Sequence, residues 1–253
     1  MYGRDKVAPP GNQAANGEHK HRPVAPEGIH LLDSLEAVLS HPTTRSHERG
    51  MLVIDDTGDR KSSRHTTHVG RQYLGSVGKV DQGIVAVTSL WADDRLYYPL
   101  HVEPYTPKGR GAGNEEAAAF RSKPQIALAL IDAALEMGVE FRAVVADSFY
   151  GDNLTLEGEL SAAEVPYLLA VKPSRGLWAP VKEAHTPAEA ARRLRWAGQG
   201  KPRGWTRVER EFRDGHGERW WAADLRLGSY GPDRSIRMVV ATTDPETLPE
   251  LST

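Results

Sequence analysis

Two short apolar runs, each leading directly into aspartate, restrict how this chain can fold. Met51–Ile54 is followed by Asp55 and Asp56, and Phe141–Ala146 is followed by Asp147. A short apolar run bounded by polar residues is typical of a buried strand, which must be covered by other elements. The two runs therefore predict two strands of one sheet, with acidic side chains where the strands end.

Around these runs the chain alternates between strand and helix patterns. Strands are marked by β-branched and aromatic residues between glycines, and helices by apolar residues with proline near the start and glycine after the end. In chain order the patterns predict strands at Val69–Leu74 and Ile84–Trp91, helices at Pro124–Met137 and Asn153–Ala163, and a strand at Pro166–Val171. A strand meander followed by helix–strand alternation predicts an α/β fold, with a mixed sheet flanked by helices.

Changes in composition divide the chain into four parts. The first is rich in proline, glycine, asparagine and histidine and has no periodicity beyond one short helix at Ile29–Leu39. A later part contains a basic helix and three strand patterns, at Trp205–Phe212, Arg219–Leu227 and Ile236–Thr242. The expected parts are a disordered arm and linker at 1–50, an α/β core at 51–175, a β-rich insertion at 176–243 and a truncated connector at 244–253.

Composition excludes several kinds of protein. The chain has no cysteine, which excludes disulfides, thiolate zinc sites and cysteine nucleophiles. No run approaches the roughly 18 apolar residues of a membrane span, and the first residues lack the apolar segment of a secretory signal. With a net charge of −2, the chain is expected to bind nucleic acid only through local basic patches.

The aspartates suit a divalent metal ion. Carboxylates at the ends of neighbouring strands can hold Mg²⁺ or Mn²⁺, which prefer oxygen ligands, and two such ions support phosphodiester cleavage. Because successive strand residues face opposite sides, one of Asp55 and Asp56 is expected to face the site and the other to bind backbone or solvent. For each aspartate alone, including Asp147, a turn or helix cap is an equally frequent outcome.

Several motifs also occur in the order found in one family. They are Asp55-Asp56-Thr57-Gly58, Lys61, Gly70-Arg71-Gln72-Tyr73-Leu74-Gly75, Leu96-Tyr97-Tyr98-Pro99, Phe120-Arg121-Ser122-Lys123-Pro124, VVADSFYGDN and YLLAVKPS. From about Met51 to Thr253 this ordered set resembles the bacterial insertion-sequence transposases of the DDE superfamily. That family has an RNase H-like catalytic core with a β insertion.

The resemblance implies a function and a site. It matches Asp55 or Asp56 to the first catalytic aspartate and Asp147 to the second, with Mg²⁺ or Mn²⁺ as cofactor. The implied activity is hydrolysis at transposon ends followed by attack of a 3′-hydroxyl on target DNA. The implied partners are transposon-end DNA and target DNA, without a membrane. A dimer in the DNA complex is possible, and the implied location is the bacterial cytoplasm, at the nucleoid.

Two departures from the family pattern lead to alternatives. The third acid of the family is a glutamate in a helix beyond the β insertion, and the candidates here lie in the wrong context: Glu209, Glu211, Glu246 and Glu250. Residues 1–50 also differ from the helical DNA-binding region that precedes the family's core. A fragment truncated at both ends is therefore expected, binding DNA weakly without strand transfer. The alternatives are an inactive DNA-binding remnant and a metal-dependent nuclease of the same fold.

Basic residues supply candidate DNA contacts. One group lies beside a predicted hairpin and the other in a basic run, and for both the alternative is a solvated surface. The candidates are Arg71, Gln72 and Lys79, and then Arg192, Arg193, Lys201 and Arg203. For the tryptophans of the basic region, Trp196, Trp205, Trp220 and Trp221, core packing is favoured over stacking on a flipped base.

Overall fold

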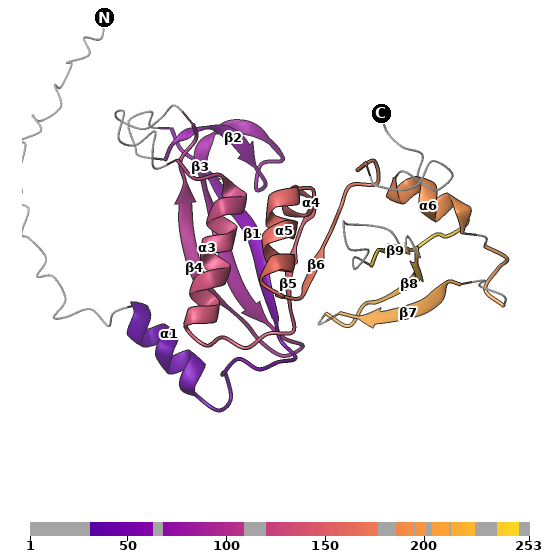
Figure 1. Ribbon diagram of the computed structural model, residues 1–253, viewed down its shortest axis with the longest axis horizontal. Coiled ribbons are helices and arrows are strands. Elements are labelled where there is room, and N and C mark those ends of the chain that lie inside the picture. The colour runs from indigo at the N-terminus through magenta and orange to yellow at the C-terminus, as the bar shows by residue number, and fades with distance from the viewer. Residues whose placement is uncertain are drawn as a thin grey trace, which may run out of the picture.

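The computed structural model describes residues 31–62, 68–108, 120–176, 186–194, 196–200, 204–212, 214–225 and 237–247. Within these ranges the chain forms two sheets, a large one with helices packed on it and a small one that follows it in sequence (Figure 1). Most of the expected disordered arm lies outside the described residues. The helix expected at Ile29–Leu39 is present as α1, Leu31–Ser40. Within these ranges, the structure contains no helix of the length and apolarity required to cross a bilayer.

The large sheet is mixed, as the sequence predicts. Its strands are β1 (Met51–Arg60), β2 (Gly70–Leu74), β3 (Lys79–Ala92), β4 (Tyr97–Tyr105), β5 (Ala143–Ala146) and β6 (Tyr167–Leu169). The order is β2-β3-β1-β5-β6, and β4 also pairs with β3. The pairs of β3 with β1, β2 and β4 are antiparallel, whereas β5 is parallel to both β1 and β6. β1 is therefore the strand at which antiparallel and parallel pairing meet.

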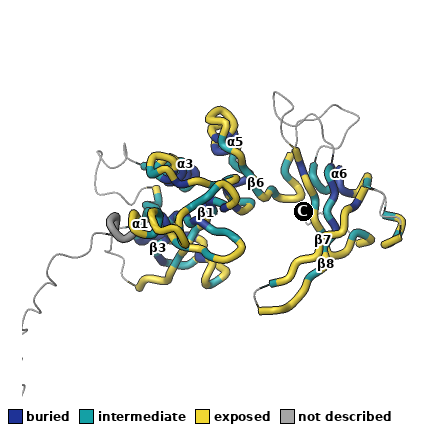
Figure 2. Tube along the Cα trace, turned by 90° about the horizontal axis from the view of Figure 1, so that it is seen from below, coloured by how far each residue is buried: buried dark blue, intermediate teal, exposed yellow. Residues whose placement is uncertain are grey.

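Helices α3 (Lys123–Glu136) and α5 (Leu154–Ala162) pack on one face of this sheet (Figure 2). Alternate residues of β1, Leu52 and Ile54, are fully buried beneath them together with Trp91 of β3. The start of α3 is fixed by a capping box between Ser122 and Gln125. The intervening β1 residues point to the other side of the sheet, and so does Asp55, which is exposed.

One expectation for β1 was wrong. The strand does not end at Asp55 and Asp56 but continues to Arg60. The reason is the length of β3, which pairs with β1 without a break from Met51↔Ala92 to Arg60↔Gly83. Only the parallel pairing with β5 ends near the aspartates, at Ile54↔Ala146.

The turn from β3 to β4 is held by a buried carboxylate. The Asp93 side chain is 3% exposed, and its Oδ1 accepts the backbone N–H groups of Arg95 at 2.7 Å and Leu96 at 2.6 Å. His47 Nε2 lies 3.2 Å from Asp93 Oδ2, and the His47 ring meets Trp91 edge-on. Burial opposes the charge of Asp93, but these hydrogen bonds and the nearby Arg95 lower its pKa to about 2.

The small sheet is antiparallel and has its own core. Its order is β7-β8-β9, with β7 at Thr206–Glu211, β8 at Gly217–Asp224 and β9 at Val239–Thr242, and α6 at Pro187–Arg193 precedes it. Trp205 and Trp221 are buried there with Ala223, and Trp196 packs edge-on against Trp221. Core packing therefore accounts for Trp205 and Trp221.

Candidate active site

Asp55 and Asp147 occupy equivalent positions on neighbouring strands. The last parallel pair of β1 and β5 is Ile54 with Ala146, and the next residue on each strand is an aspartate. Both members of that last pair are buried, so the aspartates that follow turn away from the core, and both are exposed. The parallel register therefore brings the two carboxylates together at one edge of the pairing.

The electrostatics of Asp55 agree with this geometry. Partial burial is the largest effect on the pKa of Asp55 and raises it. The N–H of Asp56 donates to Asp55 Oδ1 at 2.7 Å and acts in the opposite direction. The negative charges of Asp147 and Asp56 raise the pKa further. The mutual repulsion shows that the two carboxylates lie close to one another, an arrangement that a bound cation would relieve.

Asp147 also caps a helix. It is the N-cap of α4 (Ser148–Gly151), and its Oδ1 accepts the backbone N–H groups of Phe149 at 3.0 Å and Tyr150 at 3.4 Å. The capping alternative considered from the sequence is therefore correct for Asp147. Because both bonds fall on Oδ1, the carboxylate is oriented by the helix while Oδ2 has no partner among the described residues.

Asp56 lies on the other face of β1, beneath the helices. Lys123, the first residue of α3, places its Nζ 2.5 Å from Asp56 Oδ2, and the hydroxyl of Tyr150 donates to Asp56 Oδ1. The Lys123 ammonium also lies over the rings of Tyr105, at 5.5 Å, and Phe149, at 5.2 Å. Asp56 is therefore already neutralised and hydrogen-bonded by the protein itself.

The same contacts explain Tyr150. Its side chain is 1% exposed, and burial raises the pKa of its hydroxyl strongly, as do the hydrogen bond to Asp56 and the three nearby carboxylates. The raised pKa keeps the Tyr150 hydroxyl protonated, so that it acts as a donor to Asp56.

The residues present fit a divalent ion in part. Asp55 and Asp147 offer exposed carboxylate oxygens, the donor type that Mg²⁺ and Mn²⁺ prefer. Within the described ranges, no three His, Cys, Asp or Glu side chains are grouped closely enough to hold a metal ion. Two of the glutamates considered from the sequence, Glu209 and Glu211, lie in β7, and Glu246 accepts a hydrogen bond from Trp196. These two carboxylates would therefore supply some, but not all, of the ligands that such an ion needs.

The basic candidates fall into separate groups. Arg71 and Lys79 are exposed on the hairpin of β2 and β3, whereas Arg192 and Arg193 are exposed at the end of α6, in the other half of the molecule (Figure 1). Lys201 and Arg203 lie outside the described residues.

The expectation that Gln72 contacts DNA is corrected by its burial. Gln72 is 9% exposed, and its Nε2 donates to the carbonyl of Gly83 at 2.9 Å. The side chain supports the hairpin from inside, because alternation along β2 turns it to the opposite face from Arg71.

Sequence patterns did not reveal the roles of Lys123 and Tyr150. Both stand in motifs noted above, but neither motif says which strand the start of α3 or the α4 turn will cover. Their contacts with Asp56 join residues 67 and 94 positions apart. Alternation along β1 was the available signal, because it requires Asp55 and Asp56 to have different surroundings.

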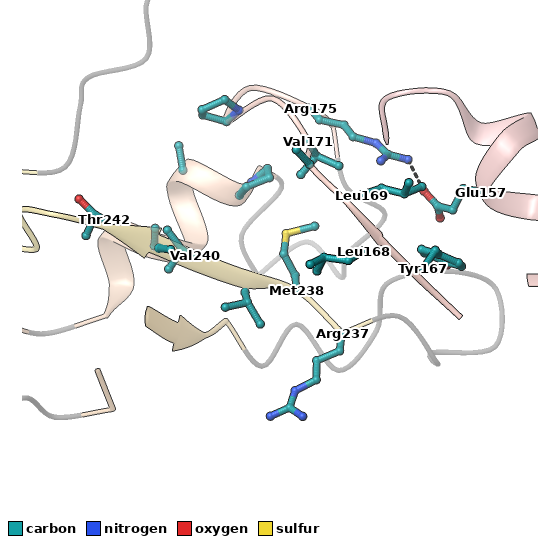
Figure 3. Close-up of a pocket in the computed structure, with 17 residues that line it drawn as sticks. Glu157, Tyr167, Leu168, Leu169, Val171, Arg175, Arg237, Met238, Val240 and Thr242 are labelled. Atoms are coloured by element: carbon teal, nitrogen blue, oxygen red, sulfur yellow. Dashed lines mark hydrogen bonds and ion pairs between the residues drawn. The ribbon is translucent and has the colours of Figure 1, made fainter. Parts of the chain in front are cut away.

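A further cavity lies away from this site. It has a volume of about 500 Å³ and lies between β6 and the segment that follows it on one side and α6 and β9 on the other (Figure 3). Its walls are mainly apolar, with Leu169, Val171, Met238 and Val240 drawn around it, and none of the three aspartates lines it. The cavity therefore marks the junction of the two sheets and is not part of the carboxylate site.

Comparisons with known proteins place this chain in a family. The family described as DDE superfamily endonuclease matches residues 30–229. A probable transposase for insertion sequence element IS701 from Microchaete diplosiphon is 32% identical over 204 residues, which is 80% of this chain and 48% of that protein. The chain thus spans about half the length of this curated relative.

Similar solved structures are remote. A Ppx/GppA family member from Aquifex aeolicus is 14% identical, with 77% of this chain and 51% of that chain covered and a TM-score of 0.22. A second structure, of the Aquifex aeolicus PPX-GPPA enzyme, is 13% identical. It covers 76% of this chain and 52% of its own, with a TM-score of 0.22. Scores this low carry no argument about the fold.

Proposed function

Because this chain belongs to the DDE superfamily endonucleases and is similar to an insertion-sequence transposase, we propose that it is the catalytic portion of a DNA transposase. In this proposal it hydrolyses phosphodiester bonds at transposon ends and joins the resulting 3′-hydroxyl to target DNA, with Mg²⁺ or Mn²⁺. It would act on DNA in the bacterial cytoplasm, as a monomer or as a dimer assembled on the ends.

The strand order supports an RNase H-like core for this activity. The three long antiparallel strands β4, β3 and β1 are followed by the parallel strands β5 and β6 on the other side of β1. This is the arrangement that the sequence resemblance implies, with the first two acids on the two adjacent strands at the centre. We propose residues 51–175 as this core and 176–243, with the small sheet, as the β insertion.

The observation that carries the proposal is the position of Asp55 and Asp147 directly after the last β1–β5 pair. We assign these two carboxylates as metal ligands and exclude Asp56, whose oxygens are taken by Lys123 and Tyr150. A bound divalent ion would act as a Lewis acid on the scissile phosphate. The two aspartates contribute negative charge, and their carboxylates would face the ion in a fixed orientation. The β1–β5 register sets the position of both, and the helix cap also orients Asp147.

DNA would be held by its phosphates. Arg71 and Lys79 project from the β2–β3 hairpin, and with Arg60 they lie near the carboxylate of Asp81. Arg192 and Arg193 add charge on α6. Contacts of this kind position the backbone without reading sequence, and their affinity falls steeply with salt.

The test is nicking of supercoiled plasmid DNA in Mn²⁺, combined with Mn²⁺ binding. We expect Asp55→Asn and Asp147→Asn each to abolish both, and the exposed Asp94→Asn, outside the site, to change neither. Unchanged Mn²⁺ binding in either site variant would contradict the assignment. Binding without nicking would favour the inactive DNA-binding remnant, and nicking without joining of transposon ends would favour a nuclease.

A further inference from the structure

We propose that Tyr150 is a positioning residue for the metal site and that Asp56 and Lys123 form the anchor to which it is fixed. The inference rests on the proposed function, because it concerns how Asp55 and Asp147 are held. It assigns a role to three side chains on the helix-covered face of β1, on the opposite side of the strand from Asp55.

Tyr150 is connected to both strands that carry the proposed ligands. Its backbone N–H donates to Asp147 Oδ1 at 3.4 Å, at the end of β5. Its side-chain hydroxyl donates to Asp56 Oδ1, in β1, on the residue next to Asp55. One residue therefore ties the carboxylate of Asp147 to the strand that carries Asp55.

The ring of Tyr150 makes this connection rigid. It is 1% exposed in the main core, and it meets Phe149 edge-on with ring centroids 5.2 Å apart. A closely packed ring cannot move its hydroxyl without moving the α4 turn. A shift of that turn would rotate the Asp147 carboxylate relative to Asp55, because the cap bonds come from the same turn.

Lys123 gives the hydroxyl a fixed partner. The Lys123 side chain is 13% exposed, and its ammonium lies 2.5 Å from Asp56 Oδ2 and over two aromatic rings. It neutralises Asp56 and keeps that carboxylate on the covered face, so that Asp56 does not turn toward the cation bound by its neighbour. The start of α3 is thereby attached to β1 at the same point.

The decisive variant is Tyr150→Phe, which removes the hydroxyl and keeps the packed ring. We expect it to weaken Mn²⁺ binding about tenfold, the lower end of the effect typical for groups that orient metal ligands. The matched control is Tyr167→Phe, which removes a tyrosine hydroxyl that lies 3.0 Å from Ser161 Oγ, away from the site. This control should leave Mn²⁺ affinity unchanged.

The measurement is the free Mn²⁺ signal in electron paramagnetic resonance, titrated against the whole chain, with thermal melting alongside. A purely structural role for Tyr150 would lower the melting temperature and leave the Mn²⁺ dissociation constant at the wild-type value, and that result overturns the inference. Asp56→Asn is the second variant and should weaken binding by about tenfold or less. If it abolishes binding as completely as Asp55→Asn, Asp56 is itself a ligand and the inference is wrong.

Failure of the proposed function would look different. In that case Asp55→Asn and Asp147→Asn would bind Mn²⁺ as the wild type does, or the wild type would not bind it. Loss of binding in those two variants with no change in Tyr150→Phe would leave the proposed metal site intact and refute only the positioning role.

Discussion

Removal of the Lys123 charge by Lys123→Met should destabilise the fold through Asp56. The pair lies 2.5 Å apart, with side chains 13% and 26% exposed. Two unit charges about 4 Å apart attract by about 4 kcal/mol at the effective dielectric near a protein surface. Desolvation offsets part of this, and hydrogen bonds to charged groups contribute about 1.5–3 kcal/mol net. Because Tyr150 still donates to Asp56, we expect a loss of about 2 kcal/mol.

A double-mutant cycle isolates the pair. Asp56→Asn with Lys123→Met removes both charges, so the double variant should be more stable than the sum of the single losses predicts, by about 1–2 kcal/mol. Urea unfolding followed by tryptophan fluorescence measures all four proteins at neutral pH. A coupling energy below about 0.5 kcal/mol, the usual limit of additivity, would refute the reasoning that these two charges interact.

Three further outcomes are expected. An added Cβ at Gly151 would overlap the carbonyl oxygen of Ala170, so Gly151→Ala should lower the free energy of unfolding in urea by about 3 kcal/mol. The helical Gly158 has open space around it, and Gly158→Ala should raise the free energy of unfolding by up to about 1 kcal/mol. The pKa of Asp93, about 2 instead of 3.8, gives stability that is full above pH 3.8 and is lost as the pH falls toward 2. Asp93→Asn should therefore cost about 2 kcal/mol at pH 7 and remove this acid sensitivity, which urea unfolding across pH 2–6 would detect; a wild-type curve that is flat in this range contradicts it. Trp221→Ala removes a buried side chain of the small sheet, worth about 3–5 kcal/mol, and hydrogen exchange should show lost protection in β7–β9 while β1 and β3 stay protected.

The elements of the large sheet could be predicted because their signals are local. The apolar runs before Asp55 and Asp147 predicted two strands, and the proline and glycine around 124–138 predicted a helix; the structure contains all three. The length of β1 could not be found in this way. Thr57, Gly58 and Asp59 have no strand pattern of their own and are extended because β3 pairs with them.

For the candidate site, the sequence predicted which aspartates follow the two apolar runs, but not that β1 continues past Asp55 and Asp56. Which of Asp55 and Asp56 faces outward depends on the burial of Ile54, and what surrounds Asp56 depends on where α3 and α4 pack. The direction of the Gln72 side chain was also not predicted. Its motif looks exposed in the sequence, but strand alternation turns this polar side chain inward.

Iron-mediated backbone cleavage is a direct test of whether Asp55 and Asp147 together hold a metal ion, as we propose. Fe²⁺ in place of Mg²⁺, with ascorbate and peroxide, generates radicals that cut the polypeptide next to the bound ion, and mass spectrometry locates the cuts. We expect cuts in β1 around Asp55 and at the junction of β5 and α4 around Asp147, both lost in Asp55→Asn and in Asp147→Asn and retained in Asp94→Asn. Cuts that persist in either site variant, or that occur away from both strands, would show that these two aspartates do not hold the ion.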